Sequence, residues 1–152
     1  MSRVSCTNIM QFEVMDRVDA IKYSNGKHPE KSAIISISST FCKPPRMYPD
    51  RNGMQTGVQA ILFLSFNDEE IGDNAIQEHH AKQIIDFVDK MVHQVDKFIV
   101  HCDAGISRSA GVCAAIQKYL GYDDFNIFNN PKYCPNMRCY RTVLEYGMQK
   151  KQ

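Results

Sequence analysis

The sequence predicts an α/β fold in which a mostly parallel sheet of about four to five strands is covered by helices on both faces. Short apolar, β-branched segments alternate along the chain with segments of helical periodicity, which is typical of this class. The 152 residues are enough for one domain with a single core. We find no internal repeat, low-complexity tract or linker, so the sequence predicts a single domain over residues 1–152.

Four segments have the composition of strands. Residues 9–15 alternate loosely and predict an outer strand, and residues 33–38 are apolar and largely β-branched. Residues 59–66 form the most hydrophobic segment, and their lack of alternation predicts a strand buried on both faces. Residues 98–101 predict a short buried strand.

The spacing of apolar residues predicts two helices in the first two thirds of the chain. A short helix is expected over residues 16–23. A long helix is expected after the acidic loop at 67–73, where Asn74 and Gln77 resemble a capping pair. The residues expected on its apolar face are Ile84, Ile85, Val88, Met91, Val92 and Val95.

Three further helices are expected toward the C-terminus. A buried, uncharged segment around residues 110–116 predicts a helix that ends near Gly121. A short helix is expected within 123–130, and a last helix begins at Pro135 or Asn136 and runs to about Met148. Residues 39–57 contain several prolines and predict a long loop, of a length that is often functional or mobile.

A strand, a tight loop and a helix meet at residues 101–109, which read His-Cys-Asp-Ala-Gly-Ile-Ser-Arg-Ser. A loop that enters a helix points several backbone N–H groups inward, and the helix dipole adds partial positive charge. Such a loop forms a cradle for an anion. The residues predicted to line this phosphate-binding cradle are Asp103, Ala104, Gly105, Ile106, Ser107 and Arg108.

Cys102 and Arg108 give the cradle its chemistry. The guanidinium of Arg108 matches phosphate oxygens in bidentate geometry. Cys102 lies at the floor, where positive potential favours the thiolate over the thiol. A thiolate beneath a bound dianion is placed for in-line attack on phosphorus. The alternative is a buried structural cysteine beside a helix-capping serine, which leaves Arg108 unexplained.

The pattern His-Cys-x5-Arg-Ser resembles the signature of the cysteine-dependent protein tyrosine and dual-specificity phosphatases. Cys-x5-Arg alone would be weak in a chain with six cysteines. The preceding strand, the following helix and the residues His101, Gly105 and Ser109 make the match specific. The resemblance is to the small dual-specificity members and covers most of the chain from Ile34 onward. It implies a phosphatase-like three-layer architecture and hydrolysis of phosphate monoesters through a cysteinyl-phosphate intermediate.

The resemblance also implies a general acid, an aspartate on a separate loop after a strand and roughly 30–40 residues before the nucleophile. Asp68 fits this position best. Asp73, Glu69 and Glu70 remain alternatives, and the segment could instead be a solvated acidic loop that favours the next helix through its dipole.

Two more residues receive roles from the resemblance. The hydroxyl of Ser109 donates to the thiolate and helps it leave the intermediate, although it could also be a helix N-cap. His101 is expected to hold the cysteine loop by hydrogen bonds rather than to transfer protons, or else to be a core histidine.

No metal or other cofactor is expected, because Arg108 and backbone amides supply the charge stabilisation. His79 and His80 are adjacent and point apart on a helix. Cys134 and Cys139 lack the spacing of zinc ligands.

The expected substrate is a phosphoprotein. The cradle carries Asp103 and no lysine, which disfavours polyanions such as inositol phospholipids. We find no tyrosine-recognition segment of the large tyrosine phosphatases, which indicates a shallower pocket open to phosphoserine and phosphothreonine as well as phosphotyrosine. The alternative function is a catalytically weak or inactive phosphate- or phosphopeptide-binding module of the same fold.

Composition sets the remaining expectations. The net charge is +1, which provides no global basic field for nucleic acid or membranes. No apolar run approaches the ~20 residues of a membrane span, and no signal peptide is recognised. We therefore expect a monomer without nucleic-acid or membrane partners. A thiolate nucleophile needs a reducing compartment, so the expected location is cytoplasmic.

Overall fold

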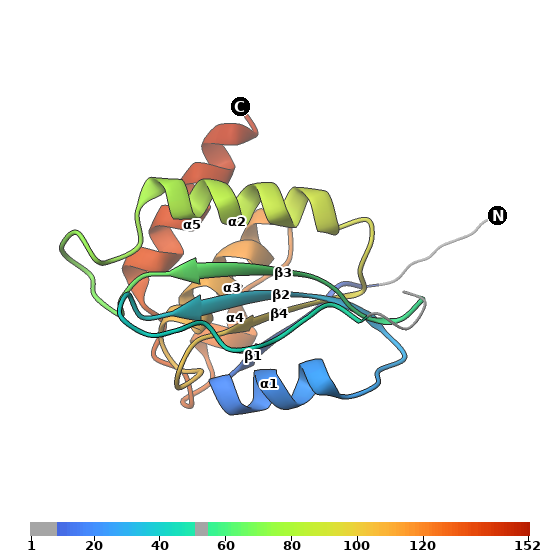
Figure 1. Cartoon of the computed structure of the whole chain (residues 1–152). Coiled ribbons are helices and arrows are strands. Elements are labelled where there is room, and N and C mark those ends of the chain that lie inside the picture. The colour runs from blue at the N-terminus through green and yellow to red at the C-terminus, as the bar shows by residue number, and fades with distance from the viewer. Residues whose placement is uncertain (1–8, 51–54) are drawn as a thin grey trace.

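A four-stranded sheet organises the chain in the computed structural model, which describes residues 9–50 and 55–152 (Figure 1). The strands lie in the order β1-β4-β2-β3, and all three pairings are parallel. Their bounds are β1 Gln11–Met15, β2 Lys31–Ser38, β3 Gly57–Ser65 and β4 Lys97–His101. Because the strands are parallel, all their carboxyl ends meet at one edge of the sheet, where ligands bind in α/β folds.

Helices cover both faces of the sheet, which confirms the predicted α/β class (Figure 1). Helix α1 lies on one face, and α2, α3 and α5 form a layer on the other, with α2 and α3 each packed against α5. The bounds are α1 Arg17–Asn25, α2 Glu78–Met91, α3 Arg108–Tyr119, α4 Phe125–Phe128 and α5 Met137–Lys150. Every helix of the sequence prediction is present, with ends shifted by a few residues.

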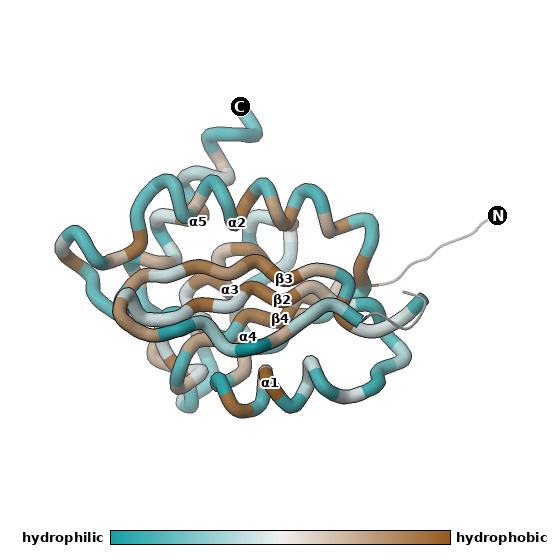
Figure 2. Tube along the Cα trace, viewed as in Figure 1, coloured by the Kyte–Doolittle hydropathy of each residue, from teal (hydrophilic) through white to brown (hydrophobic). Residues whose placement is uncertain are grey.

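The hydrophobic side chains form two cores, one on each side of the sheet. The larger core joins β2, β3 and β4 to α2, α3 and α5, and the smaller one lies under α1. Figure 2 shows hydrophobic residues along the inner strands. Met47, from the long loop after β2, is buried in the smaller core, so part of that loop is packed against the sheet.

Two element predictions were wrong in detail. The segment at 59–66 was expected to be buried on both faces, yet β3 is an edge strand and Phe63 is 42% exposed. The strands buried after their first residue are β2 and β4, because they are the two interior strands of the sheet. The capping pair Asn74 and Gln77 does not start α2. The helix begins at Glu78, and the backbone N–H of Gln77 donates to Nδ1 of His80 at 2.9 Å.

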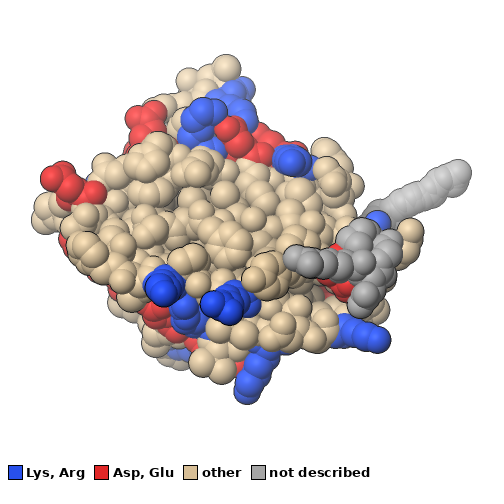
Figure 3. All heavy atoms as spheres, in the orientation of Figure 1, with Lys and Arg blue, Asp and Glu red and all other residues tan. Residues whose placement is uncertain are grey.

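The surface charges form small groups of both signs on the face seen in Figure 3. One such group links two helices, because Nζ of Lys150 on α5 lies 2.8 Å from carboxylate oxygens of both Asp86 and Asp89 on α2. Within residues 9–50 and 55–152, no helix has the length and apolar character that crossing a bilayer requires.

Candidate active site

The cysteine loop lies at the carboxyl edge of the sheet, between β4 and α3. The helix starts at Arg108, and Ser107 is its N-cap. Gly105 adopts a φ of 68°, which favours glycine. A Cβ atom there would lie only 2.7 Å from the backbone nitrogen of Asp16, so the loop packs directly against the end of β1. This close approach brings the start of α1 to the rim of the loop.

Cys102 and Ser109 face each other at the floor of the loop. Sγ of Cys102 lies 3.0 Å from Oγ of Ser109, and Cys102 is only 2% exposed. Ser109 is fully buried and is not the N-cap, so the helix-capping alternative for this serine is wrong. Its hydroxyl is placed to donate to a thiolate at Cys102.

Arg108 is buried and held by three partners from different segments. Its NH1 donates to the carbonyl oxygen of Phe66 at 2.9 Å and to Oγ of Ser39 at 3.1 Å. Its NH2 lies 3.0 Å from Oδ2 of Asp103. The guanidinium is therefore oriented before any ligand binds, which lowers the entropy lost on binding phosphate.

Asp68 lies beside the cysteine loop and is hydrogen-bonded to it. Its Oδ1 accepts hydrogen bonds from Oγ of Ser107 at 2.8 Å and from Nδ2 of Asn136 at 2.8 Å. Of the alternative acids, Glu69 accepts a hydrogen bond from the side chain of Asn67. The structure thus brings Asp68 to the cysteine loop, and its assignment as the acid remains a proposal.

Asn136 is a site residue that the sequence analysis recognised only as a helix start. Its side-chain oxygen accepts from the backbone N–H of Cys139 at 2.9 Å and so caps α5, while Nδ2 binds Asp68. Its own backbone N–H donates to the carbonyl of Ser107 at 3.0 Å. Asn136 therefore joins the cysteine loop, the acidic loop at 67–73 and α5. The helix-start pattern was the only signal, and it gave no indication of the two loops.

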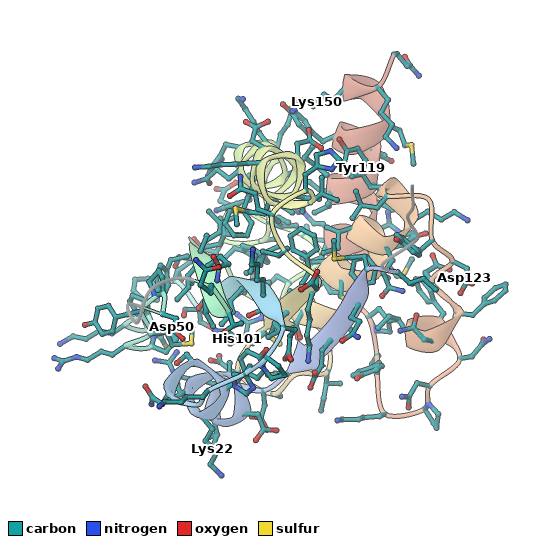
Figure 4. The ribbon with its side chains drawn as sticks, turned by 90° about the vertical axis from the view of Figure 1, so that its right-hand side faces the viewer. Lys22, Asp50, His101, Tyr119, Asp123 and Lys150 are labelled. Atoms are coloured by element: carbon teal, nitrogen blue, oxygen red, sulfur yellow. The ribbon has the colours of Figure 1, made fainter. Side chains whose placement is uncertain are left out.

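His101 supports the loop from the interior of the molecule (Figure 4). Because a carbonyl oxygen only accepts, Nδ1 carries the proton and donates to the carbonyl of Cys102 at 3.2 Å, and Nε2 accepts from Oγ of Ser36 at 2.6 Å. Burial lowers the pKa of His101, which favours this neutral form. The contacts agree with the expected role of holding the cysteine loop.

The other described cysteines are placed differently from Cys102. Burial raises the pKa of both Cys113 and Cys139 to about 12, which disfavours their thiolates. Cys42 and Cys134 are exposed, and all five cysteines of the described residues are free. In the described parts of the chain, no group of three or more His, Cys, Asp or Glu side chains is arranged to hold a metal ion.

Solved structures share this fold, although no protein-family model and no curated protein matches the sequence. Human DUSP28 superposes with a TM-score of 0.55 and 16% sequence identity, over 93% of this chain and 95% of that one. The human tyrosine phosphatase-like serine/threonine/tyrosine-interacting protein has a TM-score of 0.51 and 24% identity, over 80% of this chain and 79% of that one.

A third structure, PTPMT1 in complex with PI(5)P, has a TM-score of 0.52 and 16% identity, over 80% of this chain and 78% of that one. At these identities the similarity establishes the architecture. It agrees with the signature read from residues 101–109. The chain has the fold of the cysteine-dependent dual-specificity phosphatases.

Proposed function

We propose that this protein is an active cysteine-dependent protein phosphatase that hydrolyses phosphotyrosine monoesters, with phosphoserine and phosphothreonine as further substrates. The observation that carries the proposal is the meeting of three groups at one loop. Cys102 lies at the floor, Arg108 is pre-oriented beside it, and Asp68 is hydrogen-bonded to Ser107 of the same loop. These are the nucleophile, the phosphate-binding cation and the proton donor that the reaction requires.

In the first step, the thiolate of Cys102 attacks phosphorus and a sulfur–phosphorus bond forms. The bond from phosphorus to the leaving oxygen breaks, and Asp68 gives that oxygen its proton. Arg108 and the loop amides stabilise the charge on the three equatorial oxygens. The products are the dephosphorylated side chain and a cysteinyl-phosphate.

In the second step, water attacks phosphorus and Asp68, now a carboxylate, accepts a proton from it. The sulfur–phosphorus bond breaks, and the sulfur leaves with the electron pair of that bond. The hydroxyl of Ser109, 3.0 Å from Sγ, stabilises the departing thiolate by donating a hydrogen bond. Inorganic phosphate is released and the enzyme returns to its first state.

A phosphate- or phosphopeptide-binding module of the same fold is the second candidate function. One observation favours it: Cys102 is only 2% exposed, which limits access to its sulfur. A solved protein of this fold is described as tyrosine phosphatase-like and as interacting with serine, threonine or tyrosine. In such a module the cradle would bind the phosphate without turnover.

Hydrolysis of an aryl phosphate in the presence of a chelator separates the two functions. We expect turnover that survives the chelator, stops with vanadate in the cradle and is lost in Cys102→Ser. This variant keeps the size of the side chain and removes the nucleophile, so we expect it still to bind phosphate. A matched control is Cys42→Ser, at an exposed cysteine, which we expect to retain wild-type turnover.

Each outcome of this assay has a clear meaning. Full activity in Cys102→Ser would contradict the covalent mechanism. Absence of turnover on aryl phosphates and phosphopeptides, together with phosphopeptide binding, would favour the binding module. Activity that disappears with the chelator would contradict catalysis without a metal.

A further inference from the structure

Arg17 places a second guanidinium at the rim of the cysteine loop. It is the first residue of α1, its side chain is 30% exposed, and its backbone N–H donates to the carbonyl of Asp103 at 3.2 Å. Its NH2 donates to the carbonyl of Lys43 at 2.8 Å, and its NH1 lies 3.5 Å from Oγ of Ser38. The proposed reaction uses Arg108 and gives Arg17 no role.

The carboxylate of Asp103 lies between these two arginines. Its Oδ2 lies 3.0 Å from NH2 of Arg108 and accepts a hydrogen bond from Oγ of Ser39 at 3.3 Å. Its Oδ1 lies 3.9 Å from NH1 of Arg17. One carboxylate therefore faces both the cation expected to bind the scissile phosphate and the cation at the rim.

This arrangement determines which charges a ligand meets. The side chain of Asp103 is 44% exposed, so a ligand entering the cradle approaches an anion beside the phosphate position. The carboxylate of Asp103 offsets the positive charge of Arg17. Without that carboxylate, Arg17 would present a planar fork suited to a second phosphate group.

We propose that Asp103 and Arg17 form a specificity-determining pair that restricts the site to ligands with a single phosphate group, such as a singly phosphorylated peptide. Asp103 repels a neighbouring second phosphate and occupies the cation that would otherwise bind it. This inference rests on the proposed phosphatase site, and it states how many phosphate groups a ligand of that site can carry.

Binding measured in the Cys102→Ser background tests the pair without requiring turnover. The probes are two peptides of one sequence, one carrying only phosphotyrosine and the other carrying phosphotyrosine next to phosphothreonine. We expect the background protein to prefer the first peptide. Asp103→Asn keeps the shape and one oxygen acceptor for Arg108, and we expect it to shift the ratio of the two dissociation constants toward the second peptide by about tenfold.

Two further variants assign that shift to Arg17. Adding Arg17→Met to Asp103→Asn removes the guanidinium that Asp103 no longer offsets. This change should cancel most of the gain in relative affinity for the doubly phosphorylated peptide. Adding Lys22→Met instead removes one positive charge from the same helix, at a side chain that points away from the molecule (Figure 4), and should leave the gain in place. The gain should also shrink at high salt, where exposed charges are screened.

The results separate this inference from the proposed function. An unchanged ratio in Asp103→Asn, or a gain that persists with Arg17→Met, would overturn the specificity pair. Equal weakening of both peptides would show that Asp103 only orients Arg108, and would also overturn it. In those cases binding of the single phosphotyrosine would leave the proposed function standing. If the Cys102→Ser protein bound neither peptide and the native chain hydrolysed neither, the proposed function itself would fail.

Discussion

At the scale of single residues, the position of Asp68 depends on Asn136. We expect Asp68→Asn to lower kcat by about 10²–10⁴-fold for aryl phosphates with poor leaving groups, because a general acid contributes about this much. Asn136→Ala should lower kcat less, since Ser107 still donates to Asp68. The double variant should show little loss beyond Asp68→Asn, because residues that act through one contact are not additive.

Steady-state kinetics on a series of aryl phosphates with leaving groups of different basicity measures this coupling. Asp73→Asn is the matched control on the same loop, and we expect near-native kcat from it. Additive losses from Asp68→Asn and Asn136→Ala would mean that Asn136 acts only as the N-cap of α5. A large loss in Asp73→Asn with none in Asp68→Asn would mean that Asp73 is the acid.

At the scale of elements, the contact between α3 and α5 depends on Gly111. A Cβ atom there would overlap the carbonyl oxygen of Asn136 and lie 3.1 Å from Cβ of Cys139. Glycine to alanine within an exposed helix usually stabilises by about 0.5–1 kcal/mol. Because α5 packs so closely here, we expect Gly111→Ala to destabilise instead, by about 1–3 kcal/mol, as overpacked sites do.

Urea unfolding followed by circular dichroism measures this effect. Gln83→Ala, on an exposed position of α2, is the control for helix propensity and should change the unfolding midpoint little. Equal or greater stability of Gly111→Ala would contradict the close packing of the two helices. Because Gly111→Ala would displace Asn136, it should also weaken the hydrogen bond from Asn136 to Asp68, and kcat should fall as well.

At the scale of the whole molecule, stability should decrease as the pH falls below 6.5. Burial lowers the pKa of His101, and burial with the neighbouring charge of His79 lowers the pKa of His80 to about 4. In the unfolded chain these two imidazoles bind protons near the usual histidine pKa of 6.5, whereas in the folded chain they stay neutral at that pH. The contribution of these two neutral histidines to the free energy of unfolding is therefore fully present above pH 6.5. It decreases as the pH falls, by on the order of 1–2 kcal/mol at pH 5.

Urea midpoints at pH 7, 6 and 5 check this slope, and pH 5 remains above the range in which most carboxylates titrate. His80→Asn retains an acceptor for the backbone N–H of Gln77 and should flatten the slope. A midpoint that stays constant or rises between pH 7 and 5 would contradict neutral burial of the two histidines.

By itself, the sequence determined the elements and the cysteine loop. Cys102, Arg108 and Ser109 occupy one strand–loop–helix unit, so their spacing already specifies which side chains and amides converge. The α/β class follows from local periodicity for the same reason, because strand and helix patterns extend over only a few residues. Asp68 was assigned through the family resemblance, and the structure places it at the loop.

Only the tertiary structure decided which distant segments meet at that loop. Asn136 and Asp68 are 68 positions apart, and Ser39 and Arg108 are 69 apart. Arg17 reaches Asp103 from the start of α1, near the beginning of the chain. The edge position of β3 likewise depends on strand order, which hydrophobicity alone does not encode. Such contacts depend on the order of the strands in the sheet and on how the helices pack against it, and a short sequence pattern does not determine either.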